Sequence, residues 1–125
     1  MDQTETTRFT LVIPVYNRSD CILRCLNSII SQDYKSYEII VIDDGSTDNT
    51  CNLIENYYSL SKFVKLIHYK DNKGVNFARN RGIEHTKGEY IIFLDSDDQL
   101  TNHALSNIDS YISQHPGYLH YLFLV

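Results

Sequence analysis

The chain has 125 residues, of which 42% are hydrophobic, and its 11 Lys and Arg residues against 16 Asp and Glu residues give a formal net charge of −5. These values are typical of one soluble globular domain with its own core, and the lack of a basic run excludes a general affinity for nucleic acid. The polar segment 1–7 is no secretory signal, and no apolar stretch approaches the ~20 residues that cross a bilayer, so we expect a cytoplasmic protein.

Apolar runs and helical spacing alternate along the chain. Continuous apolar runs, typical of strands covered on both faces, predict strands at 9–15, 38–42, 63–68, 90–94 and 118–125. Helical spacing predicts helices at 20–31, from about 48 onward, at 75–85 and at 101–114. We expect Ser19 and Thr101 to be N-caps, and Gly82 to weaken the end of the third helix. The alternation predicts an α/β fold, a single domain over 1–125 with a doubly wound, mainly parallel sheet and helices on both faces.

The cysteines Cys21, Cys25 and Cys51 are odd in number and irregularly spaced, which argues against a disulfide framework and for a reducing compartment. Cys21 and Cys25 would share one helix face. We interpret them as small buried hydrophobic residues. A metal pair is the less favoured alternative, because no matching Cys or His pair follows.

Polar clusters follow each of the first four predicted strands. They comprise Tyr16 and Asn17, Asp43 to Gly45, Asn72 to Gly74, and the acidic segment 95–98. Parallel strands end at the same edge of a sheet, and ligands of such sheets bind beyond that edge. We therefore expect the four clusters to converge on one site.

The acidic segment Asp95-Ser96-Asp97-Asp98 offers hard oxygen ligands at a strand end. Such ligands suit Mg²⁺ or Mn²⁺, which keep open positions for water and phosphate oxygens, so a diphosphate is a natural partner. The alternative is a solvated acidic turn that caps the helix expected from Thr101.

Other residues of these clusters could contact the rest of a nucleotide. The Asp44 carboxylate can accept an N–H from uracil, thymine or guanine, although Asp-Asp-Gly-Ser is also a common turn and cap. Tyr16 can stack on a base or simply pack on the sheet. Arg79 can pair with a phosphate or with an acidic group of the site, and Arg81 or Lys73 could take that role instead.

Several common site motifs are missing from the sequence. It contains neither GxGxxG nor GxxxxGK[ST], which disfavours a dinucleotide-binding Rossmann site and a P-loop. No glycine-flanked serine elbow supports a Ser-His-Asp hydrolase.

Four blocks occur in a fixed order: VIPVYN, DDGSTD, NKG followed by ARNRG, and DSDD. With these blocks, the segment from residue 10 to about 100 resembles the family 2 glycosyltransferases of the GT-A fold. The resemblance implies inverting transfer of a sugar from a UDP-, GDP- or dTDP-linked donor to the hydroxyl of a glycan or lipid-linked acceptor. It also implies Mg²⁺ or Mn²⁺ as cofactor and a role in bacterial lipopolysaccharide or other surface polysaccharide, with the inner face of the membrane as a second candidate location for the full-length protein.

The resemblance also assigns roles to residues. Tyr16 and Asp44 would hold the base, and Arg79 would lie near the base and diphosphate. Asp97 would be the metal ligand, Asp95 would contact the ribose or the water shell of the metal, and Asp98 would be a further metal contact. The rest of the expected nucleotide site is Pro14, Val15, Asn17, Asp43, Gly45, Asn72, Gly74 and Ser96.

In the family, the general base is an acidic residue of the later, acceptor-binding half. We therefore expect the base beyond Val125, and expect this chain to be the donor-binding part of a longer enzyme whose acceptor-binding part is absent. The apolar run 118–125 predicts self-association into a homo-oligomer.

Two other functions remain as alternatives. The first is a non-catalytic nucleotide-binding or receiver-like regulatory module, but a receiver needs a phosphoacceptor Asp after the third strand, where this chain has His68-Tyr69-Lys70. The second is a nucleotidyltransferase, which needs an early phosphate loop rich in glycine and arginine, and residues 12–18 are not such a loop.

Overall fold

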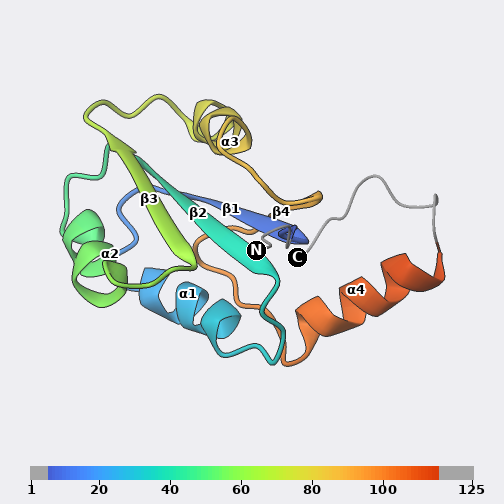
Figure 1. Ribbon diagram of the computed structural model, residues 1–125. Coiled ribbons are helices and arrows are strands. Elements are labelled where there is room, and N and C mark those ends of the chain that lie inside the picture. The colour runs from blue at the N-terminus through green and yellow to red at the C-terminus, as the bar shows by residue number, and fades with distance from the viewer. Residues whose placement is uncertain (1–5, 116–125) are drawn as a thin grey trace.

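The computed structural model describes residues 6–115, in which four strands and four helices alternate (Figure 1). The elements are β1 (Phe9–Val15), α1 (Ile22–Ile30), β2 (Tyr37–Asp44), α2 (Thr50–Tyr58), β3 (Val64–Tyr69), α3 (Val75–Ile83), β4 (Tyr90–Phe93) and α4 (Ala104–Gln114). All pairings are parallel, and the strand order is β3-β2-β1-β4. The predicted parallel α/β sheet is confirmed, and the strand expected at 118–125 lies outside the described residues.

Helices cover both faces of the sheet, which explains why the strands are continuously apolar. On one face, Phe9, Leu11 and Ile13 of β1 pack in a large core with apolar side chains of α1, α2 and α4. On the other face, Ile40 and Ile42 of β2 pack against α3, which lies alone on its side of the sheet in Figure 1. All seven residues of β1 are buried.

Two predicted helix caps are wrong. α1 begins at Ile22 with Cys21 as N-cap, and not at Asp20 after Ser19. The residues just before it form a turn in which the Arg18 carbonyl accepts the N–H groups of Cys21 and Ile22. α4 begins at Ala104, not near Thr101, and its N-cap His103 has a left-handed φ of 66°. Neither helix start has a side-chain cap hydrogen bond from its N-cap residue. Backbone turns and distant side chains therefore replace the expected caps.

Gly82 belongs to α3 and serves its packing. A Cβ atom at this position would overlap the Cγ1 methyl of Val12, so the missing side chain lets α3 approach β1 closely. α3 ends at Ile83, one residue after Gly82 and two residues before the predicted end at 85. Within residues 6–115, no helix is long and apolar enough to cross a lipid bilayer.

Candidate functional site

The loops after the strands enclose a pocket of about 490 Å³ at the carboxyl edge of the sheet. The predicted residues that line it are Pro14, Val15, Tyr16, Asn17, Asp44, Asn72, Gly74, Asp95, Ser96 and Asp97. Arg18 and Val75 also line it, and sequence reasoning missed both. The strand order changes direction between β1 and β4, and a crevice at such a switch point is the usual ligand position in open α/β sheets. The four predicted clusters do meet at one edge.

The Asp44 carboxylate is fixed in one orientation although it is almost fully buried. Its Oδ1 accepts hydrogen bonds from the Tyr69 hydroxyl at 2.6 Å and from Lys73 N at 2.8 Å, and its Oδ2 accepts Gly74 N at 2.9 Å. Burial, and next the neighbouring Asp44, raise the pKa of Tyr69, which therefore stays a protonated donor. Because Oδ2 carries one of these bonds and Oδ1 two, Oδ2 keeps the larger capacity for a further N–H donor.

Gly45 allows the loops after β2 and β3 to touch. Its φ is +78°, and an added Cβ would lie 2.6 Å from Asn72 N. This approach lets Asn72 Nδ2 donate to the Asp44 carbonyl at 3.1 Å. Asp43 is outside the pocket lining, and its Oδ1 accepts Ser46 N at 3.0 Å, so Asp43 and Gly45 shape the turn that follows Asp44.

Asn17 ties the loop after β1 to the loop after β2. It has a φ of 52°, and its Oδ1 accepts Thr47 N at 2.8 Å and Asp48 N at 3.2 Å. This arrangement leaves Tyr16 in the pocket wall with 42% of its surface exposed. Of the two interpretations of Tyr16, the exposure favours a side chain with a free face over one packed on the sheet.

The acidic turn brings three carboxylates together. One oxygen each from Asp95, Asp97 and Asp98 lies within 4.8 Å of the others, and Asp98 N donates to the Asp95 carbonyl at 3.0 Å. Three convergent carboxylate oxygens are the hard donors that Mg²⁺ and Mn²⁺ prefer, so the residues present fit such an ion. Asp97 and Asp95 line the pocket and Asp98 does not.

The hydrogen bonds at the start of α4 do not support the alternative role of the acidic turn as a cap for this helix. The Leu105 N–H, in the first turn of α4, donates to Gln32 Oε1 at 3.1 Å. The Ala104 N–H donates to the Thr101 carbonyl at 3.2 Å. Within the described contacts, neither of these two N–H groups therefore depends on Asp98.

Arg79 is the predicted cation that stands beside the acids. Its Nη2 lies 3.5 Å from Asp95 Oδ1, and its guanidinium lies 5.9 Å from the centre of the Phe93 ring. Its buried Nε has no hydrogen-bond partner among the described residues. The two residues that could replace Arg79 as the cation of the site have other partners: Arg81 pairs with Glu84 at 2.7 Å, and the Lys73 ammonium lies over the Phe77 ring. Arg79 does not line the pocket itself.

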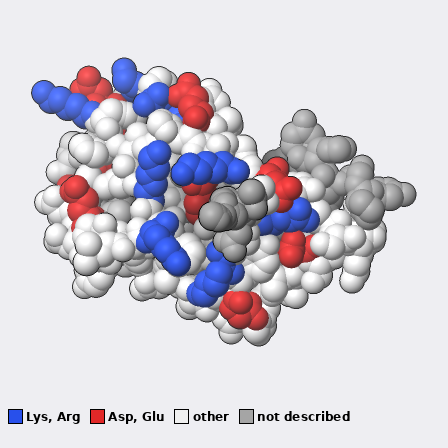
Figure 2. All heavy atoms as spheres, in the orientation of Figure 1, with Lys and Arg blue, Asp and Glu red and all other residues white. Residues whose placement is uncertain are grey.

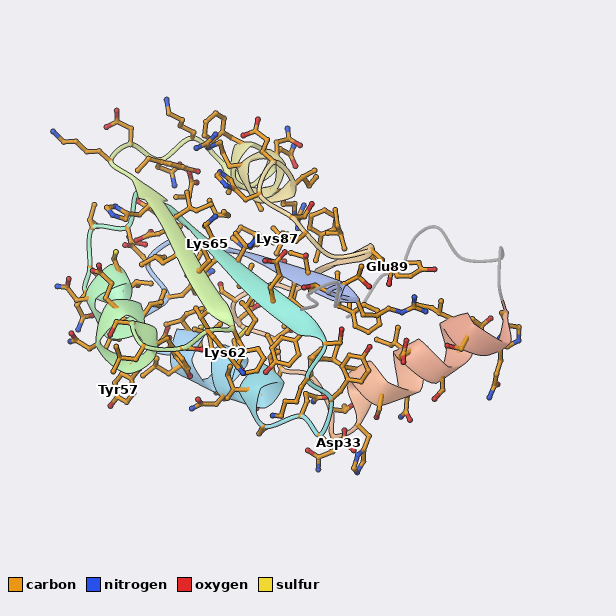
Figure 3. The ribbon with its side chains drawn as sticks, viewed as in Figure 1. Asp33, Tyr57, Lys62, Lys65, Lys87 and Glu89 are labelled. Carbon is orange, nitrogen blue, oxygen red and sulfur yellow. The ribbon has the colours of Figure 1, made fainter. Side chains whose placement is uncertain are left out.

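Three exposed lysines, Lys62, Lys65 and Lys87, are not part of the pocket lining. Figure 2 shows Lys and Arg side chains spread over one face, and Figure 3 places Lys62, Lys65 and Lys87 among them. Arg18 is the Lys or Arg residue in the pocket lining, and Arg79 contacts Asp95 of that lining.

The two neighbouring cysteines, Cys21 and Cys25, are buried and free. Burial raises the pKa of Cys25 to about 12, so it is a neutral thiol, and it packs in the main core. Among the described residues, neither cysteine belongs to a group of three potential metal ligands. Of the two interpretations, the structure favours small core residues.

Sequence comparison places the chain among transferases. The model of the family described as Glycosyl transferase family 2 matches residues 10–119. YibD, an uncharacterized glycosyltransferase of Escherichia coli, is 41% identical over 95 residues, which are 76% of this chain and 27% of that protein. TuaG of Bacillus subtilis, named as a teichuronic acid biosynthesis glycosyltransferase, is 33% identical over 90 residues, 72% of this chain and 36% of that protein. The chain thus spans well under half of the length of these relatives.

Solved structures show the same fold. TarS 1-349 of S. aureus in complex with UDP-GlcNAc superimposes with a TM-score of 0.81 and 32% identity, covering 86% of this chain and 32% of that chain. The mannosyltransferase PcManGT of Pyrobaculum calidifontis, in complex with GDP-Man and Mn²⁺, gives a TM-score of 0.78 and 26% identity, covering 88% of this chain and 33% of that chain.

Proposed function

Because the chain belongs to glycosyl transferase family 2, we propose that it binds the nucleotide-diphospho-sugar donor of an inverting, metal-dependent glycosyltransferase. Its fold is that of the GT-A glycosyltransferases. The observation that carries the proposal is one pocket with a buried, oriented carboxylate, Asp44, in one part of its wall and the acidic turn 95–98 in another. TarS in complex with UDP-GlcNAc, and PcManGT in complex with GDP-Man and Mn²⁺, support it.

The base of the nucleotide would bind at Asp44. Its Oδ2 would accept an N–H from uracil, thymine or guanine, and the free face of Tyr16 would stack on the ring. The backbone around Gly74 would complete this end, since Gly74 both lines the pocket and holds Asp44.

The diphosphate would bind at the acidic turn. Asp97, with Asp95 and Asp98, would hold Mg²⁺ or Mn²⁺, and the bound ion supplies charge neutralisation for the departing nucleoside diphosphate. Arg79 would keep the Asp95 carboxylate oriented, and Arg18 would add positive charge to the wall of the pocket.

In the reaction we propose, an acceptor hydroxyl oxygen bonds to the anomeric carbon as the bond from that carbon to the diphosphate oxygen breaks. The acceptor proton passes to a general base, for which we assign no residue within 6–115 and which we place in an acceptor-binding half of a longer protein. The acceptor is proposed to be a bacterial surface glycan or lipid-linked sugar, in line with the name of TuaG. The cytoplasmic location stays a prediction.

Calorimetric titration of the chain with UDP, GDP and dTDP, each with and without Mn²⁺, tests the donor site. We expect one of the three to bind, and Mn²⁺ to tighten that binding. Asp97→Ala should remove the effect of Mn²⁺, whereas Asp71→Ala, at an exposed Asp of a neighbouring loop outside the pocket lining, should not. Failure of all three nucleotides to bind in millimolar metal would overturn the proposal. A nucleotide affinity that is the same with and without Mn²⁺ would favour a non-catalytic nucleotide-binding module.

A further inference from the structure

Three polar side chains of α1 and its C-terminal turn face the segment that carries the acidic turn. Cys25, Ser28 and Gln32 are spaced by three and four residues, which places them on one side of the helix. The segment between β4 and α4 passes along this helix (Figure 1). Each of the three side chains bonds to the backbone of that segment or of the first turn of α4.

The first two contacts bracket the acidic turn. Cys25 Sγ donates to the Asp95 carbonyl at 3.7 Å, at the start of the turn. Ser28 Oγ accepts Leu100 N at 3.0 Å, just after its end, and donates its own proton to the Cys25 carbonyl at 2.6 Å. The bond to the Cys25 carbonyl thus orients the Ser28 hydroxyl so that its oxygen can accept the Leu100 N–H.

Gln32 makes the third and most buried contact. Gln32 is only 4% exposed, and both ends of its side-chain amide form hydrogen bonds. Nε2 donates to the Thr101 carbonyl at 2.8 Å and to the Ser28 carbonyl at 3.0 Å, while Oε1 accepts Leu105 N at 3.1 Å. One side chain therefore joins α1, the end of the acidic segment and the start of α4.

We propose that Cys25, Ser28 and Gln32, here called the α1 anchor, are positioning residues that set the backbone of the acidic turn for a divalent cation. This inference rests on the proposed function, because it assumes that the turn holds the metal. Three carboxylate oxygens within 4.8 Å of one another repel, so a free loop would open in the absence of a cation. The α1 anchor opposes this opening and keeps the ligands preorganised, which raises the affinity for the ion.

Ser28→Ala tests the α1 anchor, because it deletes only the hydroxyl that binds Leu100 N. Mn²⁺ affinity is measured by electron paramagnetic resonance of free Mn²⁺ in the presence of UDP, or of whichever nucleotide binds. We expect roughly 10-fold weaker Mn²⁺ binding, as for outer partners of metal ligands, with unchanged affinity for the nucleotide in the absence of metal. Ser31→Ala, at an exposed serine of the same helix end, is the matched control and should bind Mn²⁺ like the wild type.

Two further variants keep the outcome decisive. Ser28→Thr retains the hydroxyl and should restore Mn²⁺ affinity. Cys25→Ala removes the contact to Asp95 and should weaken Mn²⁺ binding in the same direction as Ser28→Ala. A purely structural role would lower the melting temperature of these variants without changing Mn²⁺ affinity, and that result would overturn the inference. If the wild type itself bound no Mn²⁺, the proposed function would fail, which is a distinguishable result.

Discussion

At the scale of the residue, the Tyr69 hydroxyl is the contact that most directly sets the direction of Asp44. Tyr69→Phe deletes one of the two hydrogen bonds to Oδ1 and leaves the ring packed edge-on against Phe77. A hydrogen bond to a charged group contributes about 1.5–3 kcal/mol, so we expect nucleotide affinity to fall by about 10-fold or more. Calorimetric titration measures this effect.

The control for this prediction is Tyr57→Phe, at a tyrosine 68% exposed on α2, which should change nothing. Mn²⁺ affinity should also stay unchanged in Tyr69→Phe, because the acidic turn is held by other contacts. Equal affinity of Tyr69→Phe and wild type for the nucleotide would show that Lys73 N and Gly74 N suffice to orient Asp44.

Asp44 and Tyr69 show which contacts of the site can be predicted from the sequence. Asp44 could be predicted, because an acidic pair after an apolar strand and before Gly-Ser is a visible pattern. Tyr69 could not, because its contact with Asp44 depends on the register that pairs these two residues across β2 and β3. Register is decided by packing of whole strands, and a single strand sequence does not contain it. Arg18 was missed for a lesser reason, since it directly follows Tyr16-Asn17 and is a cation at the same strand end.

At the scale of the element, strand positions could be predicted better than helix starts. The apolar runs gave each of the four described strands to within a residue or two, because burial on both faces leaves a continuous signal. Local preference alone predicts Ser19 and Thr101 as N-caps. In the structure, the Ala104 N–H donates to the Thr101 carbonyl and the Leu105 N–H donates to the Gln32 side chain. The contact with Gln32 depends on tertiary packing, which local propensity cannot indicate.

The contact between α3 and β1 gives a prediction at this scale. Gly82→Ala adds a methyl group where the Cγ1 of the fully buried Val12 already lies. Overpacking of this kind costs about 1–3 kcal/mol, and the better helix propensity of alanine returns at most about 1 kcal/mol. We expect a net loss of roughly 1–2 kcal/mol in the free energy of unfolding, measured by urea denaturation.

Two controls isolate the steric cause. Asn76→Ala, at an exposed position of the same helix, should leave stability unchanged or slightly raised. Val12→Ala removes the methyl groups that the new side chain would meet, so Gly82→Ala should cost less in that background than in the wild type. An additive result in this cycle would exclude the predicted clash.

At the scale of the whole molecule, strand order decides where the loops meet. The alternation of strands and helices along the sequence predicts a parallel sheet, and hence polar clusters at one edge. The order β3-β2-β1-β4 was not predicted, although it places the loop after β1 beside the acidic turn after β4, at a switch point of the sheet. Chain order alone does not say on which side of β1 the fourth strand adds, because long-range packing determines it.

This arrangement predicts which parts of the molecule respond to a ligand. UDP with Mn²⁺, or the nucleotide that proves to bind, should slow amide exchange in the carboxyl-edge segments 14–18, 72–75 and 95–98. The turn at Lys87 and Gly88 lies at the opposite edge, where Glu38 and Thr10 accept its N–H groups, and its exchange should not change. Hydrogen exchange followed by mass spectrometry measures both regions in one experiment.

In Asp97→Ala, adding Mn²⁺ to the nucleotide should give no extra protection at 95–98. Equal slowing at both edges would mean that ligand binding only raises global stability by mass action, and would contradict a site at the carboxyl edge.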